Sequence, residues 1–269
     1  MEKVPIQDIP PEICRRIRYV LTDIDDTLST HGKILPEAYQ ALWDLSRAGL
    51  TVIPITGRCA GWVDHIARFW PVGGVVGENG AFYFIMKGGK LFKKYYLDLK
   101  DAQKVKGNLL AIRDEILAKY PQLGIASDQP YREFDLAIDF CEDVPRAPWS
   151  IVEDVVEIFR KHGAQAKVSS IHVNGWFGDF NKLKMTRAFL REQFNIDLTK
   201  LADKQQVIFI GDSPNDQPMF EFFAESAAVS NISDFWNNLT FKPKYVCEHS
   251  GGLGFAEFAH TLLAKRALD

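Results

Sequence analysis

Short apolar runs alternate with amphipathic segments toward both ends of the chain. The runs at residues 17–21, 51–55 and 206–210 are mostly apolar or β-branched, which is typical of strands buried on both faces. Residues 36–49 and 182–194 place apolar side chains at helical spacing. This alternation predicts an α/β fold with a doubly wound, mostly parallel sheet covered by helices on both faces.

Later segments continue this pattern. We expect strands at 226–230 and 244–247 and a helix at 253–265. Pro54 has no N–H group for a strand ladder, so the strand at 51–55 is expected to lie near a sheet edge or to be short.

Residues 97–176 show a different order of elements. The pattern predicts a helix, two strands, a helix and a strand, at residues 100–119, 123–127, 134–140, 149–162 and 166–173. This order is typical of a small α+β unit. We therefore expect a core of residues 1–96 and 177–269 into which a cap, residues 97–176, is inserted.

Three predicted strands end in loops with polar and acidic side chains. These are Asp23, Asp25 and Asp26 after the first strand, Thr56 and Arg58 after the second, and Asp212, Asn215 and Asp216 after the strand at 206–210. An acid after a strand is by itself more often a turn former or a helix cap, so the prediction depends on the joint pattern. Ligands of open parallel sheets lie beyond the carboxyl ends of the strands, so we expect these side chains to converge. Converging carboxylates repel one another, and a hard divalent cation such as Mg²⁺ would relieve that repulsion.

Composition narrows the class of protein. With 32 basic and 35 acidic residues, the net charge of −3 provides no overall positive field for a nucleic acid. Apolar runs such as 81–86 are too short to span a bilayer, and the first residues lack the apolar stretch of a secretory signal. The four cysteines are scattered without metal-ligand spacing. We expect a cytoplasmic protein with no nucleic-acid or membrane partner.

The strand-end motifs resemble those of the haloacid dehalogenase superfamily, and the resemblance covers nearly the whole chain. Asp23-Ile24-Asp25-Asp26-Thr27 is similar to the first motif of that family, Thr56 to the second, Lys182 to the third and Gly211-Asp212-Ser213-Pro214-Asn215-Asp216 to the fourth. Lys184 is the alternative for the third motif, but Met185 and Phe189 follow Lys182 at the spacing of a buried helix face.

The position and character of the cap resemble the type IIB subclass of that superfamily. This subclass includes the Cof-type sugar phosphatases and the sucrose-phosphate, trehalose-phosphate and mannosylphosphoglycerate phosphatases. Glu78-Asn79-Gly80-Ala81 is also similar to a segment common in the subclass. Asp26 is a departure, since many Cof-type members carry glycine there, but aspartate is common elsewhere in the superfamily.

The resemblance implies a Mg²⁺-dependent phosphatase that forms an aspartyl-phosphate. Asp23 would be the nucleophile and Asp25 the general acid and base, because one carboxylate cannot be anionic and a proton donor at once. Thr56 and Lys182 would bind the phosphate, with Gly57 and Asn215 in supporting roles. The implied metal ligands are Asp23, Asp25 through its carbonyl oxygen, Asp212 and Asp216.

His172, Asn174 and Trp176 would share one face of an extended strand in the cap. Such a face suits a polyhydroxylated substrate, but His172 and Trp176 would equally well pack at the junction of cap and core. Arg58 and Arg132 are candidates for contact with a second anionic group, although a solvated arginine is the simpler interpretation of Arg132. Asn79 is a further candidate for substrate selection.

The sequence therefore predicts hydrolysis of a small phosphorylated metabolite, which we expect to be a sugar phosphate. A phosphomutase of the same subclass is an alternative, since it would use the same pair of aspartates. A receiver-like signalling module is an alternative from another class, but it needs neither an acid two residues after its phosphorylated aspartate nor a cap of this size.

Overall fold

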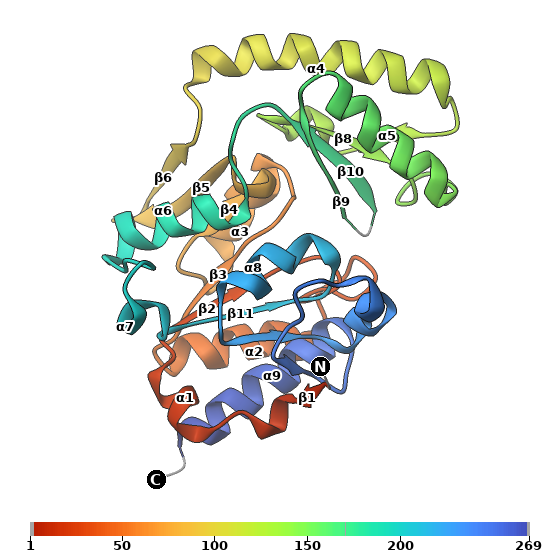
Figure 1. Cartoon of the computed structure of the whole chain (residues 1–269). Coiled ribbons are helices and arrows are strands. Elements are labelled where there is room, and N and C mark those ends of the chain that lie inside the picture. Colours follow the sequence, from red (N-terminus) through yellow and green to blue (C-terminus); the bar gives the residue numbers. More distant parts are fainter. Residues whose placement is uncertain (1–2, 170, 268–269) are drawn as a thin grey trace.

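The structure is a computed structural model that describes residues 3–169 and 171–267, with the backbone alone for residues 99–104. Its described residues form three β-sheets with helices packed on them. Figure 1 shows a lower part that contains both ends of the chain and an upper part crossed by the long helix α4 (Leu99–Lys119). None of the helices in the described ranges combines the length and the apolar character that a membrane crossing requires.

The lower part is built on a six-stranded sheet of order β1-β13-β12-β11-β2-β3, in which every neighbouring pair is parallel. Its strands are β1 (Val4–Pro5), β2 (Tyr19–Thr22), β3 (Thr51–Pro54), β11 (Val207–Gly211), β12 (Ser226–Ala228) and β13 (Tyr245–Val246). The predicted parallel α/β sheet is confirmed. Pro54 ends β3, the last strand in this order, as expected for a residue that cannot donate to a further ladder.

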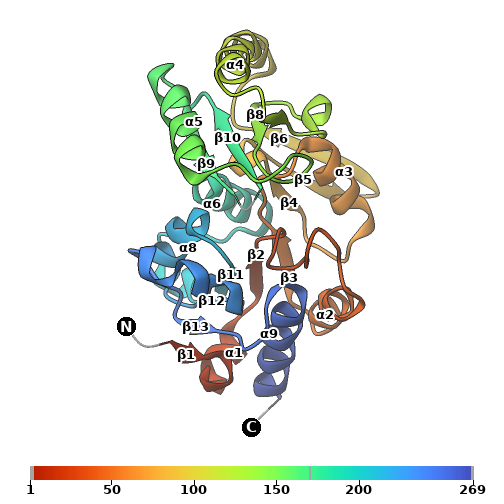
Figure 2. The ribbon, with the colours of Figure 1, turned by 90° about the vertical axis from the view of Figure 1, so that its right-hand side faces the viewer.

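Helices cover both faces of this sheet. Val20 and Leu21, which are successive residues of β2, belong to different hydrophobic clusters because neighbouring strand residues point to opposite faces. One face packs on α1 (Pro11–Arg16), α2 (Pro36–Arg47) and α9 (Gly251–Arg266), and the other on α6 (Lys182–Phe194) and α8 (Gln217–Phe222). Figure 2 shows α2 and α8 on opposite sides of β2. Further helices of the described residues in this part are η1 (Ile6–Asp8), α7 (Leu201–Lys204), η4 (Pro214–Asp216) and η5 (Ser230–Asn238).

A three-stranded antiparallel sheet of order β4-β5-β6 adjoins β3 through a single bridge between Ile55 and Val76. It contains β4 (Val75–Gly77), β5 (Phe82–Lys87) and β6 (Lys90–Tyr95), with η2 (Glu78–Gly80) after β4 and α3 (Ala60–Phe69) packed beside it. The hydrophobic pattern does not predict the hairpin of β5 and β6. Its aromatic residues pack with α3 and with Phe134 and Trp176 from the upper part, so this sheet forms the junction between the two parts.

The upper part is an antiparallel sheet of order β7-β8-β10-β9. Its elements are α4, β7 (Gly124–Ile125), η3 (Gln129–Tyr131), β8 (Asp135–Asp139), α5 (Trp149–Lys161), β9 (Gln165–Val168) and β10 (His172–Trp176). Leu136, Ile138 and Val173 face the two helices in one hydrophobic cluster. The alternate residues, among them His172 and Asn174, therefore face the lower part.

The prediction of one strand at residues 166–173 is wrong. The chain forms β9 and β10 there, two strands of an antiparallel hairpin. Ser169 Oγ accepts a hydrogen bond from His172 N at 2.9 Å and donates one to the His172 carbonyl oxygen at 3.1 Å. A turn held by such a hydroxyl group is not visible in the pattern of apolar residues. Ser170 lies outside the described residues.

Candidate active site

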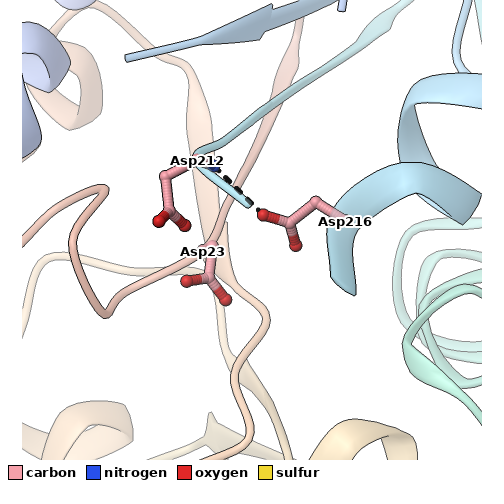
Figure 3. A group of neighbouring side chains, drawn as sticks. All are labelled: Asp23, Asp212 and Asp216. Carbon is pink, nitrogen blue, oxygen red and sulfur yellow. Dashed lines mark hydrogen bonds between the residues drawn. The ribbon is translucent and has the colours of Figure 1, made fainter. Parts of the chain in front are cut away.

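The acids predicted at the strand ends lie together at the carboxyl edge of the six-stranded sheet. Asp23 follows β2, Asp212 follows the neighbouring strand β11, and Asp216 ends η4. In Figure 3 the three side chains surround one common space. One carboxylate oxygen of each residue lies within 4.8 Å of the others, and all three residues are buried. The register that places Ile210 beside Thr22 brings the two loops together.

Lys182 supplies the positive charge of this group. Its Nζ lies 2.7 Å from Asp23 Oδ1 and 3.1 Å from Asp216 Oδ1. Asn181 caps α6 by accepting a hydrogen bond from Lys184 N at 2.9 Å, so Lys182 is the first residue of the helix. Lys184 is exposed instead and pairs with Asp179.

Burial sets the protonation equilibria of this group. It raises the pKa of Asp23 to about 7, with Lys182 opposing the shift and Asp216 adding to it. Burial, and then the charges of Asp23 and Asp216, raise the pKa of Asp212 well above its usual range. Although burial acts in the opposite direction, the charges of Asp216 and Asp23 raise the pKa of Lys182. The carboxylates are therefore short of positive charge.

The donor set fits a divalent cation. When all three carboxylates are ionised, their negative charges exceed the single ammonium charge by two. Carboxylate oxygens are the ligands that a hard cation such as Mg²⁺ prefers. The Asp25 carboxylate is not part of this group and pairs with Arg58, so its predicted contribution to a metal site is limited to the backbone carbonyl oxygen.

Two residues that the sequence analysis did not select hold Asp212 in place. Thr27 Oγ1 donates to Asp212 Oδ1 at 3.2 Å, and Asn231 Nδ2 donates to Asp212 Oδ2 at 3.3 Å. Asn231 Nδ2 also donates to the Asp26 carbonyl oxygen at 3.0 Å. Thr27 belongs to the first motif and could have been selected. Asn231 lies in η5, and no sequence signal connects it to the first loop.

Gly57 and Arg58, in the loop after β3, line one cavity together with Asp23 and Asp212, and Thr56 precedes them. Thr56 is fully buried, and its Oγ1 accepts a hydrogen bond from Arg58 N at 3.0 Å, which leaves the hydroxyl hydrogen for another acceptor. Asn215, predicted as a supporting residue, contacts Ser213, whose Oγ donates to Asn215 Oδ1 at 2.8 Å.

Arg58 joins the first loop to the upper part of the molecule. Its Nε lies 3.0 Å from Asp25 Oδ1, and its Nη1 lies 3.2 Å from Glu142 Oε1, in the loop after β8. His172 Nε2 lies 2.9 Å from Glu142 Oε2, although the pair lacks hydrogen-bond geometry. Contact with His172 and the charge of Arg58 lower the pKa of Glu142 to about 2, against the effect of burial. The sequence analysis did not select Glu142.

Arg132, a candidate for contact with a second anionic group, is used within the protein. Its side chain is 1% exposed and forms ion pairs with Asp128 at 2.8 Å and Asp135 at 3.0 Å. It also donates to the Gly57 carbonyl oxygen at 2.9 Å. Asp135 Oδ2 in turn accepts a hydrogen bond from Asn174 Nδ2 at 3.0 Å. This geometry assigns Arg132 to the support of Asn174 and of the loop after β3.

Glu78 forms a further connection between the two parts. Its carboxylate accepts hydrogen bonds from Ala60 N at 3.1 Å, Glu133 N at 2.9 Å and Phe134 N at 2.6 Å. Gly80, with φ +105°, lets this segment approach α6, because a Cβ there would lie 2.2 Å from the Asn181 carbonyl oxygen. The segment thereby brings Asn79 to the site.

A cavity with about 400 Å³ of empty space, part of it open to solvent, lies between the strand ends and the upper sheet. Asp23 and Asp212 line it on one side, and His172 and Asn174 line it on the other, with Asn79 between them. Trp176, on the same face of β10 as His172, instead packs with Phe180 at the junction. Of the two interpretations of this face, packing holds for Trp176, while His172 and Asn174 line the cavity.

The structure thus combines a parallel sheet, a lysine-bridged acidic group at its strand ends and a separate antiparallel sheet across the cavity. Residues 20–117 match the sequence model of the haloacid dehalogenase-like hydrolases. A phosphoglycolate phosphatase of Thermoplasma acidophilum is 24% identical over 88% of this chain and 94% of its own. Phosphoglycolate phosphatase 1 of Saccharolobus solfataricus is 23% identical over 92% of this chain and 96% of its own. The sucrose-phosphatase of Synechocystis, solved with sucrose and phosphate, superposes with a TM-score of 0.61 at 19% identity, covering 92% of this chain and 98% of its own.

The match over residues 20–117 agrees with the family expected from the strand-end motifs, and the phosphatase relatives support an enzyme of the phosphatase type. The expected α/β fold is confirmed.

Proposed function

We propose that the protein is a Mg²⁺-dependent phosphatase that hydrolyses a small phosphorylated metabolite through an aspartyl-phosphate, with a sugar phosphate as the expected substrate. The observation that carries this proposal is the buried group of Asp23, Asp212 and Asp216 bridged by Lys182 at the strand ends. The phosphatase relatives support the reaction class. The amide and imidazole side chains on the cap side of the cavity support a hydroxylated leaving group.

Asp23 is the proposed nucleophile. Its carboxylate would attack phosphorus in line, so that a bond from an Asp23 oxygen to phosphorus forms while the bond from phosphorus to the leaving alcohol breaks. Lys182 would hold a phosphate oxygen with its ammonium group, and Thr56 would donate its hydroxyl hydrogen to another. Thr27 and Asn231 hold Asp212 in the orientation seen in the structure.

Asp25 is the proposed acid for the leaving alcohol and the base for the attacking water. Arg58 contacts both oxygens of Asp25 at 2.8 to 3.1 Å. Because Arg58 donates hydrogen bonds to both oxygens, Asp25 must part from Arg58 before it can donate a proton to the leaving alcohol. The substrate's leaving group would enter between the two residues.

Asp23, Asp212, Asp216 and the Asp25 carbonyl oxygen would hold Mg²⁺, which when bound neutralises charge on the transferring phosphoryl group. The residues themselves bind and orient the phosphate and move the proton, as described above.

We assign residues 97–176 to the cap and residues 1–96 and 177–269 to the core. Three connections support closure of the cap over the site: Arg58 with Glu142, Arg132 with the Gly57 carbonyl, and Glu78 with the backbone at residues 133–134. A closed cap would exclude water and bring His172 and Asn174 to the leaving group. The antiparallel cap between β6 and α6 supports the type IIB assignment.

The test is hydrolysis of p-nitrophenyl phosphate by the variant Asp23→Asn. An amide cannot attack phosphorus as a carboxylate does, so we expect a loss of kcat of about a thousandfold or more with the fold retained by circular dichroism. Asp26→Asn removes the same charge three residues away and serves as the matched control, with activity near that of the wild type. Activity retained in Asp23→Asn would contradict the nucleophile assignment.

A further inference from the structure

Both arginines that line the cavity within the described residues are paired with two carboxylates, Arg58 with Asp25 and Glu142, and Arg132 with Asp128 and Asp135. Lys182, beside the acidic group, likewise pairs with Asp23 and Asp216. Lys182 lies where the phosphate would bind. In the half of the cavity that would hold the leaving group, each of these arginines is therefore already neutralised by carboxylates.

Two side-chain nitrogen atoms in this half lack a hydrogen bond within the described residues. They are Asn79 Nδ2 and His172 Nε2, whose residues are 6% and 2% exposed, and His172 Nε2 has only its poorly aligned contact with Glu142. Both side chains line the cavity. Buried polar atoms usually form hydrogen bonds in folded proteins, so two such atoms facing one cavity indicate a ligand that forms hydrogen bonds there. Hydroxyl groups can donate to or accept from such atoms without adding a charge.

Glu142 controls the charge of this half of the cavity from behind its lining. It comes from the loop after β8, and its backbone N–H donates to Asp139 Oδ1 at 2.7 Å, which fixes the loop. One carboxylate oxygen contacts Arg58 and the other contacts His172. With a pKa lowered to about 2, this carboxylate is ionised at neutral pH. When Asp25 releases Arg58 during turnover, Glu142 remains as its partner.

We propose that Glu142 is a positioning residue that sets substrate class: by keeping Arg58 paired, it selects phosphate monoesters with an uncharged, hydroxylated leaving group over monoesters that carry a second anionic group. This inference rests on the proposed phosphatase function. A second anion would lose its hydration in the cavity and meet no unpaired cation, and it would be repelled by Glu142. Without the carboxylate of Glu142, Arg58 becomes available to such an anion.

The experiment compares two small phosphate esters of similar size, 2-hydroxyethyl phosphate and 2-phosphoglycolate. The first carries a neutral hydroxymethyl group at the position where the second carries a carboxylate. We expect the wild type to have a kcat/KM about tenfold or more higher for 2-hydroxyethyl phosphate. In Glu142→Gln this ratio falls by about tenfold or more, because kcat/KM rises for 2-phosphoglycolate while it stays level or falls for the neutral ester. A loss of structure would lower both values together.

Two variants separate charge from structure. Glu142→Asp keeps the charge and should retain the wild-type preference, and Asp143→Asn, with the same loss of charge at the next residue, should leave the ratio unchanged. An unchanged ratio in Glu142→Gln, an equal change in Asp143→Asn or Glu142→Asp, or a wild type that prefers 2-phosphoglycolate would overturn the inference.

Hydrolysis of p-nitrophenyl phosphate that depends on Asp23 would leave the proposed function intact in each of these cases. A wild type that does not hydrolyse p-nitrophenyl phosphate would refute the proposed function itself.

Discussion

The two sides of the cavity differ in how their buried charged groups are balanced. On the core side, three carboxylates share one lysine and remain two positive charges short. Toward the cap side, Arg58 of the core and Arg132 of the cap each have two carboxylate partners, and Asn79, His172 and Asn174 also line the cavity. The core side is thus suited to a cation and a phosphate, and the cap side to a neutral group. The contrast shows that the two sides of one cavity differ in charge balance, so that one side suits the reacting phosphate and the other suits the leaving group.

The largest effect that this comparison predicts is metal dependence confined to the core side. Chelation with EDTA should reduce hydrolysis of p-nitrophenyl phosphate by about a hundredfold or more, and Mg²⁺ should restore it. Mg²⁺ should also raise the melting temperature of the wild type and of Glu142→Gln, but not that of Asp212→Asn, because only the last variant loses a proposed ligand. Activity that is insensitive to the chelator would contradict the acidic site as a metal site.

A smaller effect is expected at the connection that Glu78 forms between cap and core. In Glu78→Gln, an amide nitrogen replaces an oxygen that accepts backbone hydrogen bonds, so at least one buried N–H loses its partner. We expect the free energy of unfolding to fall by about 2 to 3 kcal/mol, measured by urea denaturation. Glu153→Gln, at an exposed position of α5, is the matched control. Equal stability of the two variants would show that Glu78 does not hold the cap.

The smallest effect concerns the pH dependence of the ion pair between Glu142 and Arg58. The groups facing Glu142 are Arg58 and His172, and Asp25 lies on the other side of the guanidinium. Because the pKa of Glu142 is lowered from 4.5 to about 2 on folding, its stabilising contribution is present above pH 4.5 and is lost as the pH falls through about 2. The pair is partly exposed, so the contribution should be about 1 kcal/mol or less.

Urea denaturation of the wild type and Glu142→Gln would measure this effect. The difference in free energy of unfolding should be constant above about pH 5 and shrink toward zero near pH 2. If the difference in free energy of unfolding grows on acidification, its sign contradicts a lowered pKa of Glu142. Glu142 could then not act as a permanently ionised partner of Arg58.

Most of the core side could be predicted from the sequence because the relevant residues follow neighbouring strands. Once two apolar runs are assigned to a parallel sheet, the ends of those strands meet at one edge, and Asp23 and Asp212 come together with them. Lys182 could be preferred to Lys184 because helical spacing placed it above Met185 and Phe189 on the buried face.

The cap side could be predicted only in part. His172 and Asn174 line the cavity, but they do so from the second strand of a hairpin that the sequence analysis merged into one strand. Glu142 carries no local signal, since a glutamate in a loop is usually solvated. Glu78 stood out only as part of the segment Glu78-Asn79-Gly80-Ala81, which did not indicate that its carboxylate joins the two parts. Arg132 suggested a contact with a substrate anion, whereas the structure pairs it with Asp128 and Asp135, four and three residues away, and with the Gly57 carbonyl.

By itself, the sequence determined the α/β sheet and the presence of an acidic group at the strand ends. The sheet depends on the periodicity of apolar residues, which is local in the sequence. The acidic group depends on the rule that the carboxyl ends of parallel strands meet at one edge of the sheet. Only the tertiary structure decided which cations remain paired around the cavity. That choice depends on contacts between residues as distant as Arg58 and Glu142, whose meeting requires the cap to be docked on the core.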